Sequence, residues 1–562
     1  MTTRGSQLLS KLSDKFWAWQ CHEFPILAIR AGVDTPDDVL MRETPGDYKR
    51  RLKQVKALLS ELDKVPFAKL NVQERATYAL LERSLKGLVT AVKVKAYLRP
   101  SIFPLGPEFF LTYWADSTAL ATPADAKRYI ARLATIGQAL DGVCQCLAAG
   151  IEAGMRYPKL TVDRAVVNVR GQVAVPVEQS SFYRPLALAA GRSQTLAQLA
   201  EEGKKVIETT VYPAFRAYAD CIEKELGAHS RPSLACTDDP DGEAFYRCQI
   251  EHFTSVDSSP EEIHQLGLSE VARLDKEMRA VAEQAGFKGD LKGFRRHLVT
   301  DKSQYAANAE ELREQLEIIA KRVDLRIPEF FGHTPRTTYG VRSLPEAISA
   351  KMPPAYAQPN PADHTAAGVF WATSHPEKCP RYMHVPLVVH EAWPGHLMHL
   401  ALIQEAEGLP AFRRYGALDY SMCLEGWAVY CEGLSEEMGF CDTPEKRYGR
   451  LEMEMWRAVR LVLDTGIHAK GWSRERALEF VAENMAMPMS TMEAEVDRYI
   501  AMPGQALAYQ IGLLKIRELR RRCQEKLGEG FRIRDFHDAV MAAGAVSLPV
   551  LEDCVMAWLE TQ

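Results

Sequence analysis

The chain has 562 residues, of which 47% are hydrophobic and 25% are charged, and its formal net charge is -5. This composition is typical of a globular protein with more than one domain. The weak negative net charge gives no sign of the basic surface that nucleic-acid binding needs, and so disfavours a nucleic-acid partner. No segment approaches the run of about 18 apolar residues that spans a membrane, and Lys11, Asp14 and Lys15 interrupt the stretch where a signal peptide needs an apolar run. We therefore expect a cytoplasmic protein without a nucleic-acid or membrane partner.

The twelve cysteines are scattered and form no Cys-x-x-Cys motif. Cys144 and Cys146 are the only close pair, and Cys423, Cys431 and Cys554 lie in apolar runs with helical spacing. We interpret the cysteines as reduced thiols that serve as small core residues.

Helical patterns dominate the chain. Thr122 is a predicted N-cap with Pro123 at the first helical position, and the apolar residues that follow, up to Leu147, alternate steps of four and three. A second helix is predicted from Ser259 to the terminating Gly286. Similar patterns predict further helices over residues 5–95, 195–227, 305–323, 445–470, 474–485, 491–526 and 534–560.

Strand signals are few. The segment VVNVRGQV (166–173) is a weak candidate, and AGVFWATS (367–374) is a better one because it is short, aromatic and flanked by loop residues. We expect this second segment to lie along a cleft as an edge strand that can pair with an extended peptide. The predicted architecture is mainly α-helical with two lobes, residues 1–250 and 251–562, a cleft, and a small β-sheet near the site.

The segment HEAWPGH (390–396) opens like the zinc-binding motif His-Glu-x-x-His, but its second histidine arrives two residues late. Six residues of straight helix give a rise of about 9 Å and a rotation error of about 120°, so a straight helix cannot bring His390 and His396 together. Pro394 interrupts a helix, however, and Gly395 permits backbone conformations that other residues avoid. The sequence therefore predicts a loop or bulge at residues 393–395 that folds the two imidazoles toward one metal ion.

Two further patterns favour a metal site over a chance cluster. Six of the fourteen histidines lie between residues 364 and 399, and the apolar run VPLVV (385–389) predicts that His390 and Glu391 enter the protein interior. Buried ionisable groups persist when they are paired or bound to a metal. In this motif, the glutamate next to the first histidine acts on the metal-bound water, and we assign this role to Glu391.

A carboxylate from a following helix is the expected third ligand. The segment CLEGWAVYCEGL offers Glu425 and, one heptad later, Glu432 on the same face of a largely apolar helix. The sequence Glu-Gly-Trp-Ala resembles the Glu-Gly-Phe-Ala motif that carries the third zinc ligand in gluzincin aminopeptidases. We therefore assign Glu425 as the ligand and Glu432 as the second choice, against the alternative of an outward-facing glutamate.

Polar residues in two later helices are candidates for supporting roles. One polar stripe consists of three residues spaced four apart, Arg460, Asp464 and His468. The stripe is either an exposed face held by salt bridges or a buried set in which Asp464 or His468 orients a metal ligand or contacts the substrate. In the segment STMEAEVDRYIAMPGQALAYQIG (490–512), Ser490 and Glu493 predict a capping box, and Pro503 predicts the start of the next helix.

In the same segment, Arg498 is a candidate for holding a substrate carboxylate. Tyr499 and Tyr509 are candidates for donating a hydrogen bond to the oxyanion of the reaction. The alternative for all three is a structural role in helix packing.

The segments HEAWPGH, EGWAVYCE, RLVLDTGIHAKGWS and EVDRYIAMPGQALAYQIG resemble, in order and spacing, the motifs of the bacterial domain-of-unknown-function family 885. This family is similar to the gluzincin metallopeptidases, and its fold resembles that of the carboxypeptidase Taq family. The resemblance implies a zinc-dependent hydrolase with a helical fold and a groove over the metal. One residue departs from the pattern: the family often has Gln where this chain has His399, which leaves His399 as an extra polar contact or a competing ligand.

The resulting prediction is a zinc-dependent, carboxypeptidase-like metallopeptidase. One Zn²⁺, or another divalent transition metal, is bound by His390, His396 and Glu425, and a peptide or small amide is the substrate. A homodimer is possible. The alternatives are a metal-dependent hydrolase of a non-peptide amide or ester, and a non-catalytic helical binding protein whose site has decayed.

Overall fold

The computed structural model of the chain describes residues 4–35, 37–349 and 352–562. The architecture is mainly helical with one small sheet, as the sequence predicts. The α-helices of the N-terminal part are α1 (Arg4–Glu23), α2 (Pro25–Arg30), α3 (Pro45–Leu62), α4 (Val72–Lys93), α5 (Pro107–Ser117), α6 (Pro123–Ala134), α7 (Ile136–Glu152), α8 (Lys159–Gln172), α9 (Arg184–Ala190), α10 (Gln194–Val206), α11 (Tyr212–Asp220) and α12 (Gly242–Thr254).

The remaining elements include the sheet and all the helices around the predicted metal site. They are α13 (Pro260–Gln284), α14 (Leu291–Thr300), α15 (Ala309–Phe330), β1 (Tyr339–Ser343), α16 (Glu346–Ser349), β2 (Ala355–Gln358), β3 (Gly368–Ala372), α17 (His384–Glu391), α18 (His396–Glu405), α19 (Ala411–Tyr415), α20 (Ser421–Glu437), α21 (Pro444–Lys470), α22 (Arg474–Asn484), α23 (Met489–Ala501), α24 (Ala508–Leu527), α25 (Ile533–Ala543) and α26 (Leu548–Leu559).

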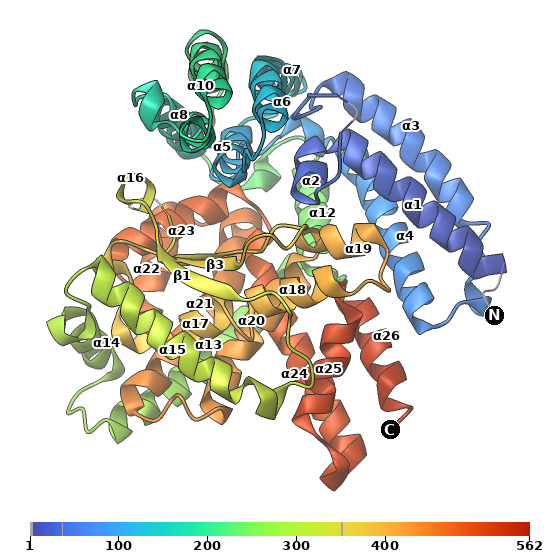
Figure 1. Cartoon of the computed structure of the whole chain (residues 1–562). Coiled ribbons are helices and arrows are strands. Elements are labelled where there is room, and N and C mark those ends of the chain that lie inside the picture. Colours follow the sequence, from blue (N-terminus) through green and yellow to red (C-terminus); the bar gives the residue numbers. More distant parts are fainter. Residues whose placement is uncertain (1–3, 36, 350–351) are drawn as a thin grey trace.

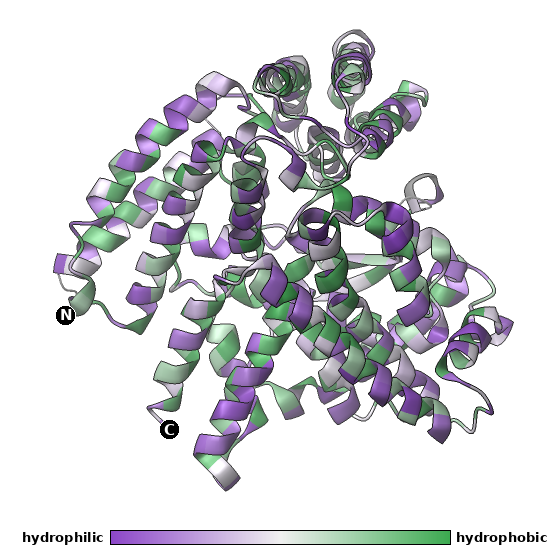
Figure 2. Ribbon diagram, turned by 180° about the vertical axis from the view of Figure 1, so that it is seen from behind, coloured by the Kyte–Doolittle hydropathy of each residue, from purple (hydrophilic) through white to green (hydrophobic). Residues whose placement is uncertain are grey.

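Three hydrophobic cores organise these helices. One core lies mainly within α5–α11, whose labelled members α5, α6, α7, α8 and α10 are at the top of Figure 1. A second joins α13–α15, the sheet, α17 and α21–α23. The third joins α1, α3 and α4 to α20 and α24–α26 and therefore crosses the predicted lobe boundary at residue 250. Figure 2 shows apolar residues concentrated on the central helices and the inward faces of the outer ones.

Local sequence signals explain where several helices begin. Thr122 and Asp125 form a reciprocal capping box at the start of α6, and Ser259 and Glu262 do the same for α13. The apolar pattern after Thr122 continues into a second helix, because the chain ends α6 at Ala134 and begins α7 at Ile136. None of the helices in the described residues is long and apolar enough to cross a lipid bilayer. All twelve cysteines are free thiols, most of them buried.

Three local predictions are wrong. Residues 166–172 of the weak strand candidate lie in α8. Ser490 lies inside the first turn of α23, which begins after Pro488 without a side-chain cap. The two helices predicted around Pro503 are present as α23 and α24, but α24 begins at Ala508, after a short 3-10 turn, and not at Pro503. In each case, tertiary packing overrides a short local pattern.

The sheet places the predicted strand differently from the expectation. The segment 367–374 does contain β3, but the strand order is β1-β3-β2, so β3 is central and pairs on both sides. It is parallel to β1, with Val341 beside Phe370, and antiparallel to β2, with Ala357 beside Phe370. An extended peptide therefore cannot add to β3, and the strands at the two edges of the sheet are β1 and β2.

Glu108 is an unusual member of the N-terminal core. Its side chain is only 1% exposed, and neither carboxylate oxygen has a hydrogen-bond partner among the described residues. Burial raises the pKa of Glu108 from 4.5 to about 8. Because the pKa of Glu108 is higher in the folded protein than in the unfolded chain, the carboxyl group is neutral at low pH and costs the fold no stability there. It destabilises the fold progressively as the pH rises from about 4.5 toward 8.

We therefore expect Glu108→Gln to raise the free energy of unfolding at pH 8 by up to about 4 kcal/mol, and by far less at pH 5. Urea unfolding curves at the two pH values measure the difference. Glu201→Gln, at an exposed position on α10, is the matched control and should change stability little at either pH. An equal effect of Glu108→Gln at both pH values would contradict a buried titrating carboxyl group.

Candidate metal centre

The predicted break between the two histidines is present. α17 ends at Glu391 and α18 begins at His396, and the backbone leaves the helical conformation at Ala392 (φ -89°, ψ -129°) and Gly395 (φ -75°, ψ -132°). A Cβ atom on Gly395 would lie 2.0 Å from the carbonyl oxygen of His390, so only glycine fits this approach. Residues 390–396 therefore form a corner and not one continuous helix.

The corner brings the two imidazoles to one carboxylate. The ring centroids of His390 and His396 are 4.8 Å apart, with the ring planes at 86°. Oε2 of Glu425 lies 3.5 Å from Nε2 of His390 and 3.4 Å from Nε2 of His396. Tetrahedral ligands about 2.1 Å from a zinc ion are about 3.4 Å from one another. The two distances from Glu425 therefore match this spacing, and all three atoms lie within 4.8 Å of one another.

Close packing of α20 against α24 positions Glu425. A Cβ atom on Gly426 would lie 2.5 Å from the Cα atom of Gly512, so the two helices meet backbone to backbone at this point. Trp427, one residue further along α20, donates a hydrogen bond of 2.9 Å from its indole nitrogen to the carbonyl oxygen of Pro394. This bond attaches the corner that carries the histidines to the helix that carries the carboxylate.

Glu432, the alternative ligand, lies on the other side of His390. Its Oε1 atom accepts a hydrogen bond of 2.7 Å from Nδ1 of His390 and another of 3.1 Å from Arg457. The Glu432 side chain is 1% exposed. A carboxylate in this position fixes the orientation and tautomer of a metal-binding histidine, so that Nε2 is free to bind the ion.

The charges within the cluster are strongly coupled. Although burial acts in the opposite direction, the carboxylates of Glu425 and Glu432 raise the pKa of His390 to about 9. Burial also opposes the change at Glu425, but the two imidazoles hold its pKa well below the usual value. Without a cation, the protonated imidazole of His390 is therefore a positive partner of the Glu425 carboxylate.

Glu391 and His399 also lie in this corner. Glu391 is 8% exposed, and its carboxylate forms no hydrogen bond with the described residues, so it is free to accept a proton. His399 is fully buried against Trp427, and neither ring nitrogen has a partner in the described part of the chain. Burial lowers the pKa of His399 to about 3, so this ring is neutral. It is not one of the three converging side chains.

The polar stripe on α21 is buried, so the exposed-face interpretation is wrong. Asp464 accepts hydrogen bonds from the hydroxyl group of Tyr246 (2.6 Å) and the backbone N–H of Gly504 (2.9 Å). His468 accepts one from the backbone N–H of Cys236 and donates one to the carbonyl oxygen of Tyr499. Asp464 and His468 therefore join neighbouring segments, and neither contacts the histidines of the corner.

The two candidate tyrosines differ in how their hydroxyl groups are used. That of Tyr499 donates to Glu495 at 2.8 Å and accepts from Arg460 (2.8 Å) and Trp456 (3.1 Å). Tyr499 is buried and its hydrogen-bonding capacity is filled.

Tyr509, in contrast, only accepts a weak bond of 3.4 Å from the Gln505 amide among the described residues. Its proton is therefore available. Arg498 donates to Glu495 at 2.9 Å and to Gln505 at 2.5 Å, so this guanidinium group already has two partners.

The sequence predictions do not include three residues that support the candidate site or its neighbours: Arg457, Glu495 and Trp427. Arg457 is three residues before Arg460 and therefore on the same helical face, so extending the stripe toward the N-terminus would have found it. Glu495 precedes Arg498 by three residues and pairs with it at 2.9 Å. The hydrogen bond from Trp427 to Pro394 has no local sequence signal, because it joins two segments that meet only in the folded protein.

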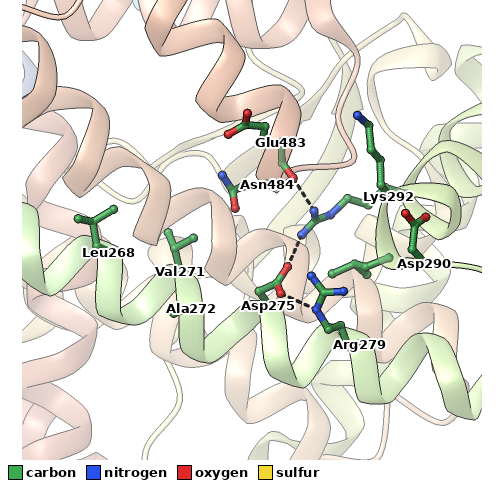
Figure 3. A pocket seen from close by; sticks show the side chains of 11 residues that line it. Leu268, Val271, Ala272, Asp275, Arg279, Asp290, Lys292, Glu483 and Asn484 are labelled. Atoms are coloured by element: carbon green, nitrogen blue, oxygen red, sulfur yellow. Dashed lines mark hydrogen bonds and ion pairs between the residues drawn. The ribbon is translucent and has the colours of Figure 1, made fainter.

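A separate hollow of about 370 Å³ lies between α13, α14 and the end of α22 (Figure 3). Arg295 reaches into it and donates to the carbonyl oxygen of Glu483, and Asp275 pairs with Arg279. These charged groups neutralise one another, and none is among the three side chains that converge at the corner.

One protein family matches the chain from residue 25 to residue 555. Its description is bacterial protein of unknown function (DUF885). The chain belongs to this family. Solved structures similar to this chain include a candidate lipoprotein from Colwellia psychrerythraea, with 25% identity, a TM-score of 0.92 and full coverage of both chains. Another is a candidate lipoprotein of unknown function from Shewanella oneidensis, with 16% identity and a TM-score of 0.74 over 98% of this chain and 99% of that one. Comparison with curated proteins gives no match.

The pKa of His390 leads to a prediction about metal binding by this DUF885 protein. Because a histidine must be deprotonated to bind a metal, zinc binding to the metal-free protein near pH 7.5 should release about one proton. Calorimetric titration in buffers of different ionisation enthalpy measures this number.

Glu425→Gln should weaken zinc binding more strongly than Glu432→Gln, for which a loss of about 10- to 100-fold is expected. His396→Ala is the control for loss of a ligand. Zinc binding that releases no proton would contradict this description of the metal-free site.

Proposed function

We propose that this protein is a zinc-dependent metallopeptidase that hydrolyses amide bonds in peptides, with a carboxypeptidase-like specificity. The observation that carries the proposal is the convergence of His390, His396 and Glu425 on one point, beside the unpaired carboxylate of Glu391. These three side chains would hold the ion. When bound there, zinc supplies the Lewis acidity that polarises a carbonyl group and lowers the pKa of water to about 7.

The remaining roles belong to the chain's own residues. Glu391 accepts a proton from the attacking water and later delivers it to the leaving amine, so the C–N bond breaks and the products are a carboxylate and an amine. Glu432 keeps the ring of His390 in place throughout. The hydroxyl group of Tyr509 donates to the oxygen that becomes negative when the carbonyl group is attacked.

Peptide specificity is supported by the resemblance to carboxypeptidases and by the free edge of the sheet. Among the described residues, β2 pairs only with β3, and it packs against α17 and α18, the helices that carry the two histidines. An extended peptide that added to this edge would run beside the metal. Arg498 gives weaker support, because its guanidinium group would have to release Gln505 before it could bind a terminal carboxylate.

The first test compares blocked peptides that end in a free carboxylate with the same peptides carrying an amide. We expect the zinc-loaded protein to cleave the free-carboxylate series, and Glu391→Gln to bind zinc normally but lose roughly 10²- to 10⁴-fold in kcat. Product analysis by mass spectrometry and zinc analysis of both proteins provide the measurements. Cleavage of esters or non-peptide amides alone would favour the second candidate function, and a wild-type protein without bound zinc would favour a binding protein.

The two tyrosines provide a matched pair for the second test. Tyr509→Phe should reduce kcat by about 10²- to 10³-fold with little change in zinc affinity, because it removes one donor to the oxyanion. Tyr499→Phe should mainly reduce the free energy of unfolding, since the Tyr499 hydroxyl group bonds to Arg460, Trp456 and Glu495. Steady-state kinetics and thermal unfolding separate the two effects. Equal kcat values for Tyr509→Phe and wild type would exclude this role for Tyr509.

A further inference from the structure

Arg457 touches both halves of the candidate site. It is 3% exposed on the buried helix α21, and its Nη2 atom donates to Oε1 of Glu432 at 3.1 Å. The same oxygen accepts the hydrogen bond from Nδ1 of His390 at 2.7 Å. The guanidinium carbon also lies over two aromatic rings, 4.8 Å from the centroid of Trp456 and 5.3 Å from that of Tyr509.

Arg460, one turn further along α21, shares the two aromatic partners of Arg457, with its guanidinium carbon 4.7 Å from the centroid of Trp456, but it does not share the carboxylate. Its guanidinium carbon lies 4.1 Å from the centroid of the Tyr509 ring, so both arginines stack on the same tyrosine. Its hydrogen bonds go elsewhere, to the hydroxyl group of Tyr499 at 2.8 Å and to Glu495 at 3.0 Å. In the described part of the chain, Arg460 has no contact with Glu432.

The charges explain why Arg457 matters for the carboxylate. Glu432 is buried, and its other oxygen, Oε2, has no partner among the described residues. A buried carboxylate that loses its cation is strongly destabilised, and it would move toward any other donor within reach. Arg457 neutralises Glu432 and fixes its position, and the geometry of the His390 ring depends on that position.

We propose that Arg457 is a positioning residue that couples metal binding to transition-state stabilisation. Through Glu432 it sets the orientation of the metal ligand His390, and through ring stacking it holds Tyr509, the proposed oxyanion donor. Of Glu432 and Tyr509, Arg460 contacts only Tyr509 among the described residues. This inference rests on the proposed zinc site and adds a residue that neither binds the ion nor touches the reacting atoms.

The two arginines provide a controlled comparison in the full-length protein. We expect Arg457→Met to weaken zinc binding by about 10- to 100-fold, measured by competition with a chromogenic chelator, and also to lower kcat. Arg460→Met should lower kcat while its zinc affinity stays within about threefold of the wild-type value. Arg457→Lys should recover part of the zinc affinity, because it keeps a cation beside Glu432.

A double-mutant cycle distinguishes this coupling from general loss of structure. If Arg457 acts through Glu432, then Arg457→Met combined with Glu432→Gln should bind zinc no more weakly than the weaker single variant. Thermal unfolding of each variant identifies those that fold poorly, and for these the Arg457→Lys protein provides the comparison. Additive losses in the cycle, or equal effects of Arg457→Met and Arg460→Met on zinc affinity, overturn the inference.

The outcome for the wild-type protein separates this inference from the proposed function. A wild-type protein that binds no zinc overturns both. A wild-type protein that binds zinc and hydrolyses peptides, with unchanged zinc affinity in Arg457→Met, overturns the coupling alone.

Discussion

The whole candidate site depends on the backbone corner between α17 and α18. A helix that continued through residues 390–396 would place the two imidazoles about 120° apart around its axis. The break at Ala392 and Gly395 removes this error, and the hydrogen bond from Trp427 to Pro394 holds the corner against α20. Without the corner, the Glu425 carboxylate would face one histidine and not two.

The second constraint is α21, which carries a set of buried charges through the middle of the protein. A buried charge is tolerated when its partners are fixed, and here one of the partners, Glu432, belongs to the candidate site. Arg457 meets Glu432, and Arg460 meets Glu495 and the Tyr499 hydroxyl group. Asp464 and His468, further along the helix, join neighbouring segments. Arg457 on α21 therefore supports the candidate site, and the later residues of the helix support the fold.

Local sequence chemistry predicted the elements whose signals are strong and lie close together in the chain. The capping boxes at Thr122 and Ser259 start helices where expected, and the apolar run before His390 is buried. Weak sequence patterns gave wrong predictions of secondary structure or strand position. Residues 166–172 are apolar and β-branched enough to resemble a strand, but they form a helix because the core of α5–α11 needs one apolar face there. β3 was expected at the edge of the sheet but pairs on both sides.

The sequence by itself determined the helical architecture, the family and the set of residues that can bind a metal, because these follow from composition, periodicity and motif order. The tertiary structure decided which members of that set meet. Glu425 and Glu432 lie one heptad apart on the same helical face, so periodicity cannot separate them. They differ by about 10 Å along the axis of α20, and only the packing of α20 against α17 and α24 brings Glu425 level with both imidazoles. Likewise, only packing fills the hydrogen bonds of the Tyr499 hydroxyl group and leaves the Tyr509 proton available.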